Sequence, residues 1–145
     1  MGMKTLIKNG QLVLPEGCRQ ADLLLEDGQI AAIGPALAAA EATVYEAGGC
    51  LVFPGFVDPH THLDMDAGDF HTADDFKSGS KAALMGGTTT LLDFATQTRG
   101  ETLAAGLQAW HELADGRSYC DYGFHLAVTD WNPQTATELP QMVAQ

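Results

Sequence analysis

The strongest constraint on the fold is an alternation of strand-like and helix-like segments that begins at residue 55. Apolar, β-branched runs such as TTTLLDFA and CDYGFHLAVTD alternate with segments of helical periodicity such as GETLAAGLQAWHELADG. In this last segment one helical face collects Leu103, Leu107, Trp110 and Ala114. Strands that alternate with helices pair in parallel, so residues 55–145 are predicted to form an α/β unit of three strand–helix pairs.

The first 54 residues have a different rhythm, in which short apolar runs are separated by turn residues. The dipeptides Asn9-Gly10 and Asp27-Gly28 predict two-residue hairpin turns, because these residue types tolerate the positive φ that such turns require. A third break is predicted at Gly48-Gly49, and ALAAAEA is predicted to be a connecting segment. Residues 1–54 are therefore expected to form a small all-β unit.

The segment TADDFKSGSKAALMGG predicts the first helix of the α/β part. Thr72 and Asp75 have the spacing of a capping box, and Gly86-Gly87 supplies a stop. The segment ELPQMVAQ predicts the start of a further helix.

Charge and composition argue against several classes of partner. Lys+Arg 7 against Asp+Glu 19 give a net charge of −12, which disfavours nucleic acid and anionic membranes. Cys18, Cys50 and Cys120 are too widely spaced for a zinc ribbon, and their odd number disfavours a disulfide framework. The sequence shows no signal peptide and no apolar run near the ~20 residues of a membrane helix. We expect a soluble, cytoplasmic protein with Cys50 and Cys120 buried in packing.

The stretch PGFVDPHTHLDM, residues 54–65, carries the clearest chemical signal. Residues two apart in a strand point the same way, so Asp58, His60 and His62 are expected to share one face. Two neutral imidazoles suit zinc or a neighbouring transition metal, and Asp58 is expected to accept a ring N–H and orient a ligand. Zinc needs at least three protein ligands, so the pair predicts part of a metal site. The alternative is an HxH pattern that arises by chance.

The remaining candidates are expected to have structural or surface roles. His111 is predicted to be a solvated helix residue, and His71 an exposed loop residue. His125 is predicted to be a hydrogen-bonded core residue of the third strand. Asp93 ends a strand at the level of the motif, where it either supports the site or has a structural role. The sequence contains no serine-hydrolase, P-loop or dinucleotide-binding motif.

Three segments together, VFPGFVDPHTHLDM, GGTTTLLDFA and DYGFHL, resemble the N-terminal third of dihydropyrimidinases (D-hydantoinases), which belong to the metal-dependent cyclic amidohydrolase superfamily. The similarity runs from LIKNG near the start to ELPQMV near the end of the sequence. The HxH pair is shared by the whole superfamily, whereas the flanking residues are closer to the hydantoinase branch.

This resemblance implies both a fold and a chemistry. It implies the N-terminal part of a TIM (β/α)8 barrel, residues 55–145, preceded by half of a small β-sandwich, residues 1–54. Members use two divalent ions, usually zinc, which share a hydroxide and a carboxylated lysine and open hydantoin or dihydropyrimidine rings to N-carbamoyl amino acids. His60 and His62 match two ligands of the first metal. Leu63 and Met65 match the loop that walls the substrate pocket, and family members are commonly homotetramers.

The family's carboxylated lysine, two further histidines and catalytic aspartate have no counterpart in this sequence, and Lys77 and Lys81 do not replace the lysine. We therefore expect no catalytic residue within this chain, and no activity from the chain alone. Its open strand edges are expected to make it poorly soluble or prone to assemble. The alternatives are an allantoinase- or dihydroorotase-like hydrolase, a non-catalytic dihydropyrimidinase-like assembly protein, or a small metal-binding α/β protein.

Overall fold

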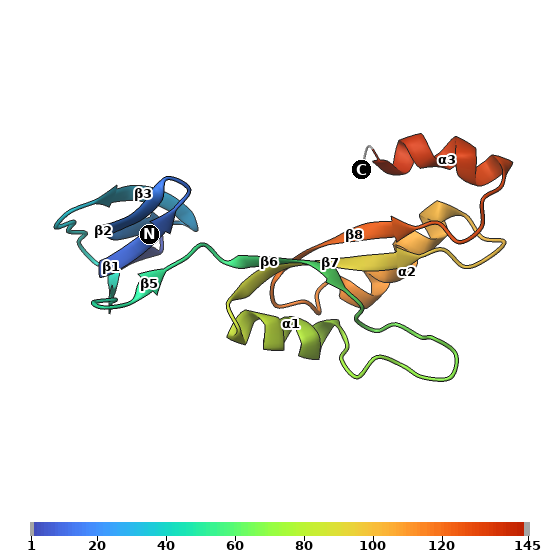
Figure 1. Cartoon of the computed structure of the whole chain (residues 1–145), viewed down its shortest axis with the longest axis horizontal. Helices are drawn as coiled ribbons and strands as arrows, with labels where there is room; N and C mark the ends of the chain where they lie inside the picture. Colours follow the sequence, from blue (N-terminus) through green and yellow to red (C-terminus); the bar gives the residue numbers. More distant parts are fainter. Residues whose placement is uncertain (1, 144–145) are drawn as a thin grey trace. The chain divides into compact units, whose positions relative to one another are not determined.

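The structure is a computed structural model that describes residues 2–143. At the Pro54–Gly55 step the chain divides into two compact units, Met1–Pro54 and Gly55–Gln145 (Figure 1). The first unit consists of strands and turns, and the second alternates strands with helices. The mixed α/β class predicted from the sequence is confirmed.

The first unit is one five-stranded sheet with the strand order β3-β2-β1-β4, in which β5 also pairs with β1. β2 pairs antiparallel with both β1 and β3, whereas β4 and β5 run parallel to β1. Its strands are β1 (Lys4–Leu14), β2 (Gly17–Glu26), β3 (Gln29–Gly34), β4 (Thr43–Glu46) and β5 (Leu51–Val52). Leu6, Leu12 and Ala21 are its buried apolar side chains.

The two predicted hairpin signals have different outcomes. Asp27-Gly28 forms the turn between β2 and β3, with φ of 49° and 76°, as predicted. The hairpin predicted at Asn9-Gly10 is wrong, because both residues lie inside β1, where the register with β2 shifts. The positive φ of Asn9 (60°) serves a β-bulge, and the Asn9 N–H donates to Asp22 Oδ1 at 2.8 Å.

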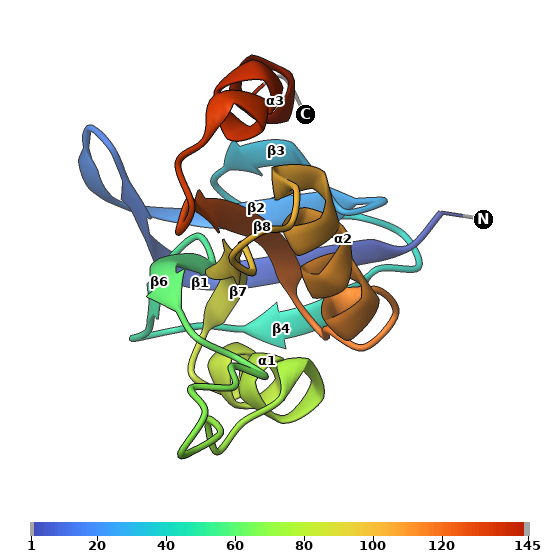
Figure 2. The ribbon, with the colours of Figure 1, turned by 90° about the vertical axis from the view of Figure 1, so that its right-hand side faces the viewer.

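The second unit is a parallel three-stranded sheet, β6-β7-β8, with helices following each strand. Its elements are β6 (Phe56–Thr61), α1 (Phe76–Met85), β7 (Thr88–Thr96), α2 (Leu103–Ala114), β8 (Asp121–Ala127) and α3 (Pro133–Val143). Helices α1 and α2 both contact β7 and each other (Figure 2), and α3 contacts α2. The core between sheet and helices contains Leu63, Phe76, Leu91 and Ala114.

Helix α1 begins one turn later than its predicted cap. The N-cap is Asp75, whose carboxylate accepts from the Ser78 N–H at 2.6 Å while Ser78 Oγ accepts from the Asp75 N–H at 3.1 Å. The capping box therefore joins Asp75 to Ser78, and the predicted pairing of Thr72 with Asp75 is wrong. The Thr72 hydroxyl oxygen instead accepts from the Met65 N–H at 2.9 Å within the preceding loop. Gly86 ends the helix, as predicted.

Among the helices of residues 2–143, none combines the length and apolar character that crossing a membrane requires.

Candidate metal centre

The HxH motif lies where β6 ends, beside the central strand of the sheet. β6 ends at Thr61, so His60 is within the strand and His62 is the first residue after it. The pairing of β6 with β7 shifts register between Asp58 and Thr61. Because such an irregularity bends the strand and redirects side chains, it shapes how the motif faces its surroundings.

The two imidazoles converge. His60 Nε2 and His62 Nε2 are 3.2 Å apart, and the rings meet edge to face with centroids 5.1 Å apart. Two nitrogens bound to one tetrahedral zinc at about 2.0–2.1 Å lie roughly 3.3 Å from each other, so the observed separation fits a shared ion. The same separation suits a hydrogen bond between the rings when one Nε2 carries the proton. Both side chains are exposed, so an ion can reach them.

Asp58 makes a different contact from the one predicted. Its Oδ1 accepts a hydrogen bond from the backbone N–H of His60 at 3.1 Å. Within the described part of the chain, no hydrogen bond links its carboxylate to a histidine ring. The structure thus gives Asp58 a role in shaping the strand end, and its predicted role in orienting a metal ligand stays a prediction.

Two aromatic side chains from the neighbouring strands complete the histidine face. The Phe94 ring on β7 packs against His60 and His62, with centroid separations of 4.4 Å and 5.1 Å. His125 on β8 also packs against Phe94 at 4.9 Å, and its Nε2 lies 3.0 Å from the Pro59 carbonyl oxygen. The prediction that His125 is a core residue is wrong, because its side chain is exposed.

The residues on the helix side of the same strands differ in character. Asp93 points away from the imidazoles, is 1 % exposed, and accepts hydrogen bonds from Thr61, Leu63 and Trp110. The sequence did not predict the packing of Phe94 on the histidines or the contact of Thr61 with Asp93, because both depend on the register between strands. The alternation of side chains along β7 could have indicated part of this arrangement, because it places Asp93 and Phe94 on opposite faces of the sheet.

The loop after the motif contains the two predicted substrate-binding residues. Leu63 is 9 % exposed and packs in the core with Phe76 and Leu91, and its place on a substrate-pocket wall stays a prediction. Met65 is half-buried and lines a cavity of about 450 Å³, together with Gln97 and Trp110. Of the two residues, Met65 alone lines this cavity, and its contact with a substrate stays a prediction.

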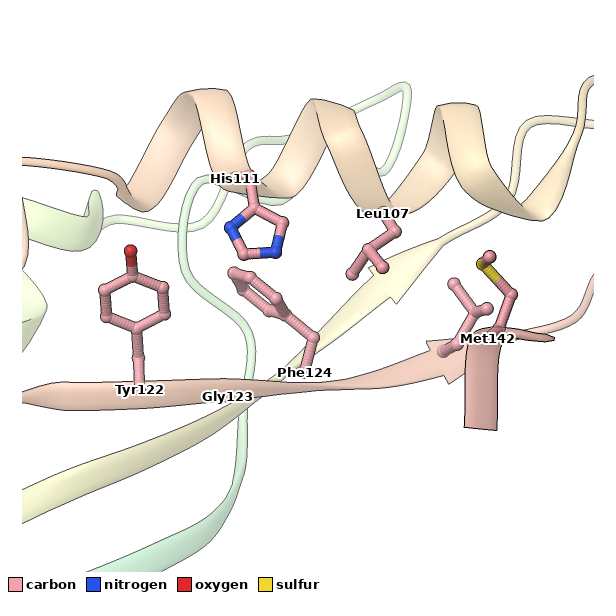
Figure 3. A pocket seen from close by; sticks show the side chains of 7 residues that line it. Leu107, His111, Tyr122, Gly123, Phe124 and Met142 are labelled. Atoms are coloured by element: carbon pink, nitrogen blue, oxygen red, sulfur yellow. The ribbon is translucent and has the colours of Figure 1, made fainter. Parts of the chain in front are cut away.

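His111 is a surface residue of α2, as predicted, with 42 % of its side chain exposed. It is half-buried, and its ring stands edge-on against Phe124 at 5.1 Å, beside a cavity of about 300 Å³ (Figure 3). Its Nδ1 lies 3.1 Å from the Asp115 carboxylate, which also accepts from the Tyr122 hydroxyl. The Tyr122 hydrogen bond lowers the pKa of Asp115, and the same bond raises the pKa of Tyr122.

The remaining predictions on titratable residues are mixed. His71 is exposed in its loop, as predicted, with Nε2 3.6 Å from Asp66 Oδ2. Cys50 is exposed and Cys120 half-buried, so the prediction of buried packing is wrong for Cys50. Lys77 and Lys81 are exposed on α1.

Across residues 2–143, no three His, Cys, Asp or Glu side chains cluster closely enough to hold a metal ion by themselves. His60 and His62 therefore fit two coordination positions of a metal centre, and further ligands are required to complete it.

Comparison with known proteins places this geometry in a family. Residues 51–130 match the Amidohydrolase family. The D-hydantoinase of Geobacillus stearothermophilus is 47 % identical over 143 residues, which cover 99 % of this chain and 30 % of that protein.

Solved structures give the same picture. A D-hydantoinase crystal structure superposes with a TM-score of 0.94 and 45 % identity, covering 99 % of this chain and 31 % of that one. The dihydropyrimidinase of Brevibacillus agri gives 0.93 and 45 %, over 97 % of this chain and 31 % of that one. The chain thus spans about a third of the length of the proteins it matches. A family match over more than half of its residues, on a fold shared with hydantoinases, shows that this chain belongs to the amidohydrolase family.

Proposed function

We propose that this chain is the N-terminal part of a metal-dependent cyclic amidohydrolase that opens hydantoin or dihydropyrimidine rings to N-carbamoyl amino acids. The observation that carries the proposal is the 3.2 Å separation of the His60 and His62 Nε2 atoms on an exposed face. The likeness to D-hydantoinase and dihydropyrimidinase structures supports the ring-opening chemistry. In this proposal residues 55–145 begin a TIM barrel, and residues 1–54 are half of a small β-sandwich.

The two imidazoles supply lone pairs to one divalent ion, for which zinc is our choice because neutral imidazole is a preferred zinc ligand. When bound, such an ion activates water and polarises the amide carbonyl. We propose that a second zinc, the bridging carboxylated lysine and the catalytic aspartate involve residues outside these 145. Phe94 excludes water from one side of the pair, since its ring packs on both imidazoles.

Met65 is the residue of this chain that we propose to contact the ring substituent of the substrate. Its side chain borders open space beside the end of β7, and apolar walls select substituents by shape. The three free cysteines support a reducing, cytoplasmic setting. A homotetramer of the whole enzyme is part of the same proposal.

A chimera tests the proposed function directly. This chain replaces the matching segment of the Geobacillus stearothermophilus D-hydantoinase, with which it shares 47 % identity. We expect the chimera to bind zinc and to open hydantoin and dihydrouracil. A His60→Ala, His62→Ala chimera is expected to contain less zinc and to lose ring opening, and metal content and ring opening are measured on the same samples.

The outcomes separate the alternatives. A folded chimera that binds zinc but hydrolyses neither ring contradicts the proposal and favours a non-catalytic assembly protein. Hydrolysis of allantoin or dihydroorotate in place of these rings favours the allantoinase- or dihydroorotase-like alternative. Unchanged zinc content in the double-alanine chimera refutes the metal role of the motif.

A further inference from the structure

Asp93 is a buried carboxylate on the face of β7 opposite the two imidazoles, and both of its oxygens are in use. Oδ2 accepts from the Thr61 hydroxyl at 2.9 Å and from the Leu63 N–H at 2.8 Å. Oδ1 accepts from the Phe94 N–H at 2.7 Å and from Trp110 Nε1–H at 3.1 Å. Four donors around a side chain that is 1 % exposed offset the cost of burying its charge and fix its orientation.

The two donors to Oδ2 come from the residues on either side of His62. Because β6 ends at Thr61, His62 and Leu63 lie beyond the regular strand. The Leu63 N–H donates to a carboxylate there, which takes the place of a carbonyl acceptor from a neighbouring strand. Asp93 therefore fixes the chain before and after His62 at the point where the strand no longer does so.

The next residue along β7 acts on the same pair from the other face. Phe94 packs its ring against His60 at 4.4 Å and His62 at 5.1 Å. The backbone that carries His62 is thus held from the helix side, while its ring is supported from the opposite side. Two metal ligands must be held to within about 0.5 Å of their working geometry, and this double support provides that precision.

We propose that Asp93 is a positioning residue that sets the direction of the His62 imidazole, and with it the separation of the two Nε2 atoms. It acts through the Thr61 hydroxyl and the Leu63 N–H and touches neither the ion nor the substrate. The inference rests on the proposed metal role of His60 and His62. It assigns a function to a buried acid that the metal chemistry itself does not use.

The test is Asp93→Asn in the full 145-residue chain. The amide has nearly the same shape as the carboxylate, but its NH₂ group replaces one of the two oxygens. The two donors that contacted that oxygen then have no acceptor. We expect the NOEs from the His62 ring to Phe94 and His60 to be lost. We also expect the Kd for Co²⁺, followed by visible absorption, to rise by about tenfold or more, the size of effect found for residues that orient metal ligands.

Ser80→Ala is the matched control for lost stability. Ser80 is also fully buried in the second unit, where it donates to the Phe76 carbonyl and accepts from the Tyr119 N–H at 2.9 Å, and neither partner contacts the histidines. This variant is expected to unfold at lower urea concentration while keeping the NOEs and the Co²⁺ affinity. An Asp93→Asn chain with both properties intact overturns the inference, as does a Ser80→Ala chain that loses both.

Two further outcomes of the experiment also decide whether Asp93 positions His62. If the unmodified chain binds no Co²⁺, its two imidazoles alone do not hold the ion, the chimera decides the proposed metal function, and the NOEs decide the positioning role. If Asp93→Asn does not fold, Thr61→Val replaces it, because this change removes one donor and keeps the carboxylate. Weakened NOEs from the His62 ring in Thr61→Val support the inference, and unchanged NOEs overturn it.

Discussion

The guanidinium of Arg117 lies 3.1 Å from the carboxylate of Asp75, so a residue just after α2 contacts the N-cap of α1. The same carboxylate accepts from the Ser78 N–H. This N–H is the largest cause that lowers the pKa of Asp75 from its ordinary value of 3.8, followed by the Ser78 hydroxyl, with Arg117 adding a smaller effect. The start of α1 and the segment after α2 are thereby joined by the ion pair of Asp75 with Arg117.

This arrangement predicts a pH dependence of stability. Because the folded pKa of Asp75 is lowered, its contribution is present above pH 3.8 and is lost as the pH falls through the folded value. Urea unfolding of the second unit is followed by tryptophan fluorescence, since Trp110 and Trp131 both lie there. Asp75→Asn keeps a good N-cap but cannot ionise, so its stability is expected to vary less in this pH range. An identical pH profile for the two proteins contradicts the prediction.

Gly79→Ala is expected to destabilise the second unit, although alanine is the better helix former by roughly 1 kcal/mol. A Cβ at Gly79 would overlap Leu63 Cδ2, inside the packed core. Overpacking of this kind costs about 1–3 kcal/mol, which exceeds the gain in propensity. The urea midpoint from tryptophan fluorescence is therefore expected to fall. Leu63→Ala combined with Gly79→Ala is expected to be more stable than the sum of the single changes implies, and a higher midpoint for Gly79→Ala alone refutes the argument.

Asp22→Ala is expected to loosen the first unit. Asp22 is 4 % exposed and accepts from the Asn9 N–H at 2.8 Å and the Leu37 N–H at 2.9 Å. Removing the carboxylate leaves two donors without an acceptor, at a cost of about 1–3 kcal/mol each where they stay buried. Hydrogen exchange of the Asn9 and Leu37 amides measures the effect. Asp22→Asn, which keeps one acceptor, is expected to give an intermediate rate at one of the two sites, and unchanged exchange in Asp22→Ala would count against the role of the carboxylate.

The 145-residue chain is expected to associate through the open edges of its three-stranded sheet. β6 and β8 are the edge strands, and Val57 on β6 is 58 % exposed. An exposed apolar edge pairs readily with another copy, whereas a lysine there blocks pairing. Sedimentation velocity at increasing concentration is expected to show association that Val57→Lys reduces. Met85→Lys is the control, because it adds the same charge at an exposed helix end (83 %). A concentration-independent monomer with a sharp melting transition contradicts the prediction.

The sequence predicted the order and type of elements well, because each depends on local periodicity. The failure at Asn9-Gly10 has a clear physical reason. Asn-Gly indicates a positive φ but not which structure uses it, and here β1 continues through the dipeptide because Asp22 on the next strand accepts the Asn9 N–H. The late start of α1 has a similar cause, since Ser78, and not a glutamate or glutamine, completes the capping box with Asp75.

For the site as well, the sequence predicts what local spacing determines and misses what depends on pairing between strands. The convergence of His60 and His62 follows from residues two apart in one segment, so the sequence alone could predict it. Leu63 was assigned to the pocket wall by resemblance, whereas its position directly after His62 puts its side chain on the helix side, where it packs in the core. Phe94 joins the histidines through the pairing of β6 with β7, and His125 through the pairing of β7 with β8, long-range relations that no local pattern encodes.

Asp93 and Phe94 are neighbours on one strand, and this adjacency limits how the gene segment for β7 can change. Substitutions elsewhere in the strand leave the two residues where they are, but inserting or deleting one codon upstream within β7 exchanges their sides. The Asp93 carboxylate would then lie on the face of the imidazoles, and the Phe94 ring would lie on the helix side, near Trp110. Indels in this strand are therefore expected to abolish metal uptake outright, even where the hydrophobic composition of the segment is preserved.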